Sequence, residues 1–178
     1  MNKEELLKIY SAYLPYELLF SRKGKTHTLT CIRTESNSNN NLMLGDNDFM
    51  YYSYDCKPIL YPVTFETLIK EIEHKGKLFV PIIEILKKQS RFDLNECDFE
   101  ISPDEEDGVF YIYVDACNKK GRYVDSISYD GNVFYNHENH QDKPVNPQWD
   151  IQSLLLKWHF NVFQIPASQF INKATLNK

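Results

Sequence analysis

Apolar side chains recur three and four positions apart in four segments, a spacing that places them on one side of a helix. The pattern predicts helices over residues 3–14, 64–76, 81–88 and 151–163. Pro15 ends the first helix and Gly76 ends the second. Thr64 is expected to accept a hydrogen bond at the N-cap of the second helix. No capping box is expected there, because Thr67 stands where Glu or Gln is usual.

Segments that are rich in β-branched and aromatic residues, or that alternate apolar and polar positions, indicate strands. They lie at residues 26–34, 49–54, 97–102, 109–116, 122–129 and 132–135. The last two segments are joined by Asp130-Gly131, a pair typical of the two-residue type I′ turn. A turn of this kind predicts that Ile127 lies opposite Phe134.

Helices near both ends and the centre, around strands joined by short turns, predict an α+β fold. We expect an antiparallel sheet, built from meanders and hairpins, packed with about four helices. The length of 178 residues fits a single domain over residues 1–178. Within that domain, the Asn-rich stretch near residues 35–48 is expected to form a flexible loop.

Composition narrows the classes of function. The net charge of −5 argues against non-specific binding to nucleic acid or to an anionic membrane. The four cysteines have no CxxC spacing, so a zinc knuckle or a thioredoxin-like site is not supported. Glu4 and Glu5 do not fit a secretory signal, and no apolar run is long enough to span a membrane. We therefore predict a cytoplasmic protein with reduced thiols.

The distribution of charge is the most unusual feature of the chain. Between Phe92 and Asn118 there are nine carboxylates and no Lys or Arg. The whole chain carries −5 and this segment −9, so the remaining residues carry +4. If residues 97–102 form a strand, Asp98 and Glu100 face water about 7 Å apart, while Phe99 and Ile101 face the core.

This segregated charge predicts an acidic face that binds another protein. The candidate protein-binding residues are Asp98, Glu100, Asp104, Glu105, Glu106 and Asp107. The structural alternative is a polar strand face followed by a solvated loop at residues 104–107.

No catalytic motif is found. The six glycines stand alone, so there is no glycine-rich phosphate loop, and no serine lies in a nucleophile elbow. His137 and His140 can share a metal with Asp142 if the segment is helical, but it lies in a polar stretch after a hairpin, which indicates a solvated loop. His159 is expected to be a core histidine with a hydrogen-bond partner. We favour a protein that is not an enzyme, with no catalytic residue, cofactor or metal.

Two other functions stay open. Tyr and Phe make the strands aromatic, and such strands can wall a pocket for a small ligand or a nucleotide; the tyrosines at residues 51–54 can form either a recognition surface or a half-buried strand. The second open function is weak nucleic-acid binding, which requires that two basic turns lie at one end of the sheet. No nucleic-acid-binding signature is present in the sequence. These turns contain Arg22, Lys23, Lys25, Lys119, Lys120 and Arg122.

Several strings also carry a resemblance. They are KPILYP at residues 57–62, LIKEI at 68–72, GKLFVPI at 76–82 and LLKWHFNVF at 155–163, together with the opening residues 2–20. In these strings the chain resembles small uncharacterised proteins encoded in prophages and mobile elements of gut Bacteroidetes. It departs from their pattern at Val63-Thr64-Phe65, where a Leu-Ser-Asp-Leu-like helix entry is usual, and at Gln164, where Gly is common. The resemblance implies a phage or mobile-element accessory protein in the bacterial cytoplasm, and it implies no catalytic residue.

Overall fold

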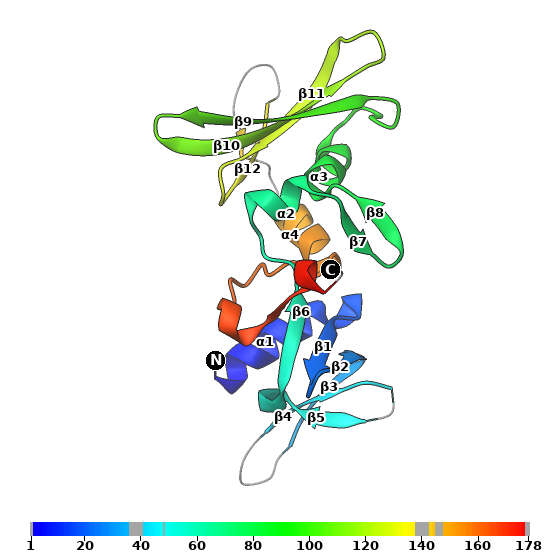
Figure 1. Ribbon diagram of the computed structural model, residues 1–178, viewed down its shortest axis with the longest axis vertical. Coiled ribbons are helices and arrows are strands. Elements are labelled where there is room, and N and C mark those ends of the chain that lie inside the picture. Colours follow the sequence, from blue (N-terminus) through cyan, green and yellow to red (C-terminus); the bar gives the residue numbers. More distant parts are fainter. Residues whose placement is uncertain (1, 36–40, 48, 138–142, 145–147, 177–178) are drawn as a thin grey trace. The chain divides into compact units, whose positions relative to one another are not determined.

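A computed structural model describes residues 2–35, 41–47, 49–137, 143–144 and 148–176 (Figure 1). The chain divides into two compact units, one made of Met1–Pro62 with Leu155–Lys178 and the other of Val63–Leu154. Four α-helices and several antiparallel sheets among the described residues confirm the α+β class. The prediction of a single domain stays a prediction, because compactness alone does not show which part folds independently.

The first unit opens with helix α1 (Lys3–Tyr13), close to the predicted bounds. The Asn2 side chain accepts a hydrogen bond from the Glu5 backbone N–H, and the Glu5 carboxylate accepts one from Asn2. This capping box satisfies two amides that the helix leaves unpaired at its start. Pro15 lies in the short 3-10 helix Leu14–Tyr16 that follows.

Two sheets complete the first unit. One has the strand order β14-β6-β1-β2, with β1 (Leu19–Arg22), β2 (Lys25–Thr28), β6 (Cys56–Leu60) and β14 (Ile171–Asn172). The other has the order β3-β4-β5, with β3 (Cys31–Thr34), β4 (Leu42–Gly45) and β5 (Met50–Tyr52). The buried side chains between these sheets and α1 include Tyr10, Tyr13, Leu18, Phe20, Leu44 and Leu60.

The single strand predicted at residues 26–34 is wrong, because the chain changes sheets at Leu29 and Thr30. The Leu29 amide donates to the Leu18 carbonyl of one sheet, and the Thr30 amide donates to the Gly45 carbonyl of the other. Leu29 is fully buried, so its side chain anchors the point where the chain passes from one sheet to the other. The predicted flexible loop near residues 35–48 is wrong in part, since it contains strand β4; residues 36–40 and 48 lie outside the described residues.

The second unit begins with helix α2 (Phe65–Ile69), which is much shorter than predicted. The remainder of the predicted helix forms the hairpin of β7 (Ile72–His74) and β8 (Lys77–Phe79). Lys75 and Gly76 connect the two strands with φ of 52° and 74°, values that suit a hairpin turn and end any helix. Helix α3 (Pro81–Gln89) follows, as predicted.

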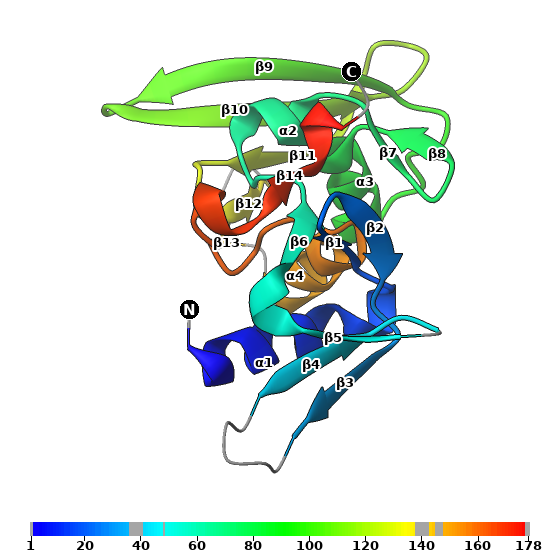
Figure 2. The same ribbon diagram turned by 60° about the horizontal axis from the view of Figure 1, so that its bottom comes forward.

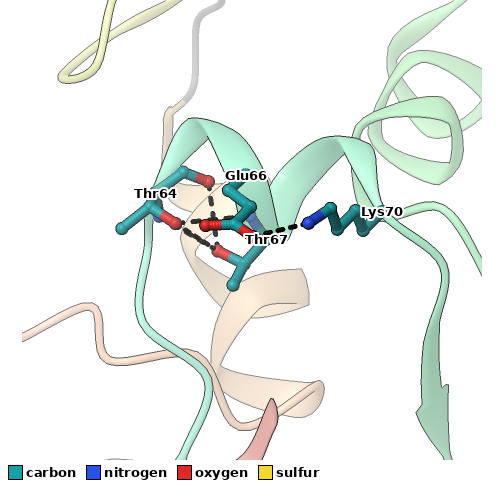
Figure 3. Close-up of polar contacts among 4 residues, drawn as sticks. All are labelled: Thr64, Glu66, Thr67 and Lys70. Atoms are coloured by element: carbon teal, nitrogen blue, oxygen red, sulfur yellow. Dashed lines mark hydrogen bonds and ion pairs between the residues drawn. The ribbon is translucent and has the colours of Figure 1, made fainter.

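Thr64 and Thr67 form the capping box that the sequence was not expected to provide (Figure 3). The Thr67 amide donates to Thr64 Oγ1 at 3.3 Å, and the Thr64 amide donates to Thr67 Oγ1 at 3.1 Å. A threonine hydroxyl accepts a hydrogen bond as a Glu carboxylate would, so the reciprocal pair needs no acidic residue. Figure 3 also shows the ion pair between Glu66 and Lys70, one helical turn apart.

The main sheet of the second unit is an antiparallel meander in the order β13-β12-β11-β10-β9. Its strands are β9 (Asp98–Glu106), β10 (Val109–Cys117), β11 (Tyr123–Tyr129), β12 (Phe134–Asn136) and β13 (Lys143–Pro144). β9 is the edge strand, and it pairs with β10 along the full length of both strands (Figure 2). β11 reaches only as far as Ile112, so the turn end of the β9–β10 hairpin extends beyond its neighbour.

The β11–β12 hairpin exists, but the predicted register is wrong by two residues. Ile127 pairs with Asn136, and Tyr129 pairs with Phe134. The Asp130 amide donates to the Val133 carbonyl, which moves the centre of the turn to Gly131 and Asn132. Asp130 is the cause, because its carboxylate accepts hydrogen bonds from the backbone beyond Gly131 and keeps Asp130 outside the centre of the turn.

The last helix, α4 (Gln148–Lys157), begins and ends earlier than predicted. His159 follows it with φ of 63°, a left-handed conformation that stops a helix. The Asn161 side chain then bonds the amide and the carbonyl of Ile165, which holds the connection without helical hydrogen bonds. His159 is buried, with its Nε2 2.9 Å from the Tyr16 carbonyl oxygen, so the predicted core histidine is confirmed.

Candidate functional site

The register of the β9–β10 hairpin sorts the acidic residues by face. Residues directly opposite in an antiparallel pair point to the same side, and successive residues point to opposite sides. Glu100 lies opposite Asp115, Asp104 opposite Tyr111, and Glu106 opposite Val109. One side of the hairpin therefore carries five carboxylates, which we call the carboxylate face: Asp98, Glu100, Asp104, Glu106 and Asp115.

Four of the six predicted binding residues come together on this face, and two do not. Glu105 pairs with Phe110 on the opposite side. Asp107 lies in the turn with φ of 51°, followed by Gly108 with φ of 76°. The solvated loop considered for residues 104–107 is wrong for the first three, which continue β9. The Asp107-Gly108 pair marks the actual two-residue turn, and it is the same dipeptide signal found at Asp130-Gly131.

No cation neutralises the carboxylate face among the described residues. None of its five members forms an ion pair with a Lys or Arg in that part of the chain. The nearby Lys119 pairs instead with Glu96, which precedes β9, at 3.4 Å. Glu100 and Asp115 stand directly opposite each other, an arrangement of like charges that destabilises a sheet. No Lys or Arg among the described residues therefore compensates this unfavourable pair of like charges.

Tyrosines continue the same side of the sheet. Tyr111 and Tyr113 alternate with the core residues of β10, and their ring centroids lie 5.9 Å apart. The Tyr113 ring contacts His137 at 5.3 Å, and His137 Nε2 lies 2.9 Å from the Ser128 hydroxyl. Tyr111, Tyr113 and Asp115 were not among the site residues predicted from the sequence. Their alternation as Tyr-Ile-Tyr-Val-Asp was the available signal.

The opposite side of the hairpin packs in part against helices α2 and α3. Phe110 packs edge-on against Phe65 of α2 with ring centroids 5.0 Å apart, and Phe65 also packs against Tyr129 at 5.6 Å. Lys87 of α3 lies over the Phe99 ring. These contacts fix which side of β9 is free, so the carboxylates cannot turn inward without breaking the core.

The metal site weighed from sequence at His137, His140 and Asp142 stays untested, because only His137 lies among the described residues. His137 bonds Ser128, while His140 and Asp142 lie outside the described residues. Within the described ranges, no group of three or more His, Cys, Asp or Glu side chains is arranged to hold a metal ion.

The two basic turns weighed for nucleic-acid binding belong to different sheets. Arg22 and Lys25 face each other in the β1–β2 hairpin of the first unit. Lys119 and Arg122 flank the β10–β11 turn of the second unit, in a different sheet. Arg22 is also engaged locally, since its guanidinium lies 4.8 Å from the centre of the Tyr51 ring. The two basic turns therefore do not share one end of a sheet.

A second polar cluster lies in the first unit, and the sequence does not single it out. His27 Nδ1 lies 2.6 Å from Asp46 Oδ2, which joins β2 to the turn after β4. The imidazole is stacked on Phe20 at 5.3 Å and contacts Tyr51 at 4.6 Å. The predicted aromatic strand at 49–54 is thus a shorter strand, β5, whose Tyr51 ring packs among Phe20, His27 and Arg22. Tyr52 and Tyr54 stack on each other at 5.2 Å.

Comparisons with protein-family models, curated proteins and solved structures found no match to this chain. Among the described residues, no helix has the length and apolar character needed to cross a membrane.

Proposed function

We propose that this protein binds, through its carboxylate face, a protein partner whose contact surface is rich in Lys and Arg. The observation that carries the proposal is the β9–β10 register, which brings Asp98, Glu100, Asp104, Glu106 and Asp115 to one exposed side. Carboxylates at alternate positions of a strand repeat about every 7 Å. A partner with basic side chains at the same interval complements them residue by residue.

The like-charged pair of Glu100 and Asp115 supports a function in binding rather than in folding. Opposite charges supplied by a partner convert the unfavourable pair into a favourable one, so the stability lost in the free protein is recovered in the complex. The negative potential of the carboxylate face repels phosphate groups. A basic protein is therefore a better candidate partner than a nucleotide or a nucleic acid.

The neighbouring tyrosines supply the second part of a binding surface. Tyr111 and Tyr113 offer flat, partly exposed rings beside the charges, and Tyr is enriched at protein interfaces. Lys and Arg side chains contact such rings favourably through cation–π interactions. At the turn end of the hairpin, Val109 lies opposite Glu106 on the carboxylate face and is about two-fifths exposed, so it adds apolar contact area.

The test compares two variants with the same change in net charge. The first reverses two residues of the carboxylate face, Glu100→Lys with Asp104→Lys. The control reverses two exposed carboxylates away from it, Glu71→Lys with Glu105→Lys. The probe is a fluorescent peptide that alternates lysine with threonine, and binding is followed by anisotropy at low and high salt.

Wild type and the control should bind the peptide, with affinity that falls as salt rises, and the face variant should not. Equal loss in both variants would show that only net charge matters and would overturn the assignment of the face. The accessory role in a phage or mobile element, in the bacterial cytoplasm, stays a prediction carried by the resemblance alone.

A further inference from the structure

Three residues stand in one row across the sheet β3-β4-β5, which belongs to the first unit, whereas the carboxylate face belongs to the second. Cys31 of β3 pairs with Gly45 of β4, and Gly45 pairs with Met50 of β5. Residues in one row share a side of the sheet, so the Cys31 and Met50 side chains flank the bare backbone of Gly45. The buried Leu42 and Leu44 alternate with Gly45 along β4 and point to the other, core side.

The two sulfur atoms meet above Gly45. Cys31 Sγ lies 3.5 Å from Met50 Sδ. A Cβ atom added to Gly45 would stand 2.3 Å from Cys31 Sγ and 2.6 Å from Met50 Sδ, so only glycine leaves the space that both sulfurs occupy. Gly45 has no left-handed backbone conformation that would otherwise require glycine. Its role in the row is therefore steric.

We propose that Cys31 and Met50 form a binding site for a soft monovalent metal ion, Cu(I) or its analogue Ag(I). Thiolate and thioether sulfurs are the donors that select Cu(I) over the harder divalent ions. With metal–sulfur bonds of about 2.3 Å, sulfurs 3.5 Å apart enclose an angle of about 100° at the metal. The pair can therefore occupy two neighbouring positions of a site with three or four ligands. Binding releases the Cys31 thiol proton to solvent as the sulfur–metal bond forms.

Met43 provides a third sulfur on the same side of the sheet. It precedes Gly45 by two residues on β4 and pairs with Arg33 and Tyr52 in the next row. Cys31 is exposed and Met50 is half-buried, so an ion can reach the pair from solvent. Carboxylates and imidazoles are not needed, because the proposed ligands are sulfur atoms.

The competing thiols differ from Cys31 in their surroundings. Burial raises the pKa of the Cys56 thiol to about 11, so it stays protonated at neutral pH. Cys117 is half-buried at the end of β10, in the second unit, and provides a matched control.

The experiment titrates the reduced protein with Cu(I) against the chelator bicinchoninate, and with Ag(I) while the Met50 methyl resonance is followed by NMR. We expect one ion per chain with a shift of the Met50 methyl signal. Cys31→Ser should abolish binding at this site. Met50→Leu and Gly45→Ala should each weaken it by about ten-fold or more, since even an outer-shell partner of a metal ligand contributes about 10–100-fold. Cys117→Ser should bind as the wild type does.

Three results would overturn the proposal: a Met50 methyl signal that does not move, Met50→Leu and Gly45→Ala variants that bind as tightly as wild type, or a Cys31→Ser variant that keeps the ion. Each would mean that free thiols alone take up the metal. Circular dichroism of the variants separates loss of the site from loss of the fold.

Discussion

Glu100 of β9 stands directly opposite Asp115 of β10, so one rung of the hairpin joins two carboxylates. Like charges on one rung oppose the pairing of the two strands, so this pair destabilises the free protein. A basic partner would remove the repulsion in the complex. Glu100→Gln is therefore expected to raise the free energy of unfolding by about 0.2–1 kcal/mol. Urea denaturation at low salt measures the gain, which should shrink at high salt.

Asp98→Asn is the matched control for this change. Asp98 lies on the same strand and the same face, but opposite Cys117 rather than a carboxylate. The control should stabilise the protein less than Glu100→Gln does. An equal gain in both variants would mean that total charge, and not the Glu100–Asp115 rung, governs stability.

Asp130 organises the β11–β12 turn. Its carboxylate accepts hydrogen bonds from the Asn132 and Val133 amides at 2.7 and 2.6 Å and from the Tyr135 hydroxyl at 2.9 Å. Partial burial acts to raise the pKa of Asp130, but these hydrogen bonds outweigh it and lower the pKa from its ordinary value. Asp130→Ala is expected to lower the free energy of unfolding by about 1–2 kcal/mol at neutral pH.

The pH dependence follows from that lowered pKa. A carboxyl whose pKa is lower in the folded chain stabilises the fold above its unfolded value, and this contribution is lost as the pH falls through the folded pKa. The difference in stability between wild type and Asp130→Ala should therefore be full at neutral pH and shrink below about pH 4. A difference that grew on acidification would contradict the assignment.

The His27–Asp46 hydrogen bond joins the two sheets of the first unit. Both side chains are mostly buried, with 16% and 19% exposed, so their interaction is weakly screened. Asp46→Ala removes this bond and the bond from the Phe49 amide, and it should lower the free energy of unfolding by about 2–3 kcal/mol. Thermal and urea denaturation measure the loss.

Asp55→Ala is the comparison for Asp46→Ala. Asp55 Oδ2 lies 3.9 Å from Arg22 Nη2, and both side chains are about one-third exposed. Exposed ion pairs contribute about 0–1 kcal/mol to the free energy of unfolding. If the two variants lost equal stability, the special role of the His27–Asp46 bond would be refuted.

The threonine capping box of α2 gives a further prediction. Thr64→Ala should destabilise the protein by about 1 kcal/mol, and Thr67→Val should also destabilise it, because each removes an acceptor for a terminal amide. The two losses should not add in the double variant, since each hydroxyl serves the other's backbone. Fully additive losses, measured by urea denaturation, would show that the two caps act independently.

Local patterns predicted most of the elements because local spacing decides which side of an element can be buried. The stripe of α1 and the alternation of the exposed Asp98 and Glu100 with the half-buried Phe99 and Ile101 on β9 are examples, and both were correct. The helix predicted over residues 70–76 was wrong, because Ile72 fits the apolar stripe of a helix and the alternation of a strand equally well. Lys75 and Gly76 adopt positive φ angles, which end a helix and form the turn of a hairpin instead.

The sequence by itself determined the α+β class, the concentration of negative charge between Phe92 and Asn118, and the exposure of Asp98 and Glu100, because these depend on composition and on neighbours along the chain. Only the tertiary structure decided that Asp115 joins them while Glu105 turns away, and that Cys31 meets Met50 above Gly45. Pairing between strands sets these relationships, and a register depends on the packing of the whole sheet rather than on the spacing within one strand.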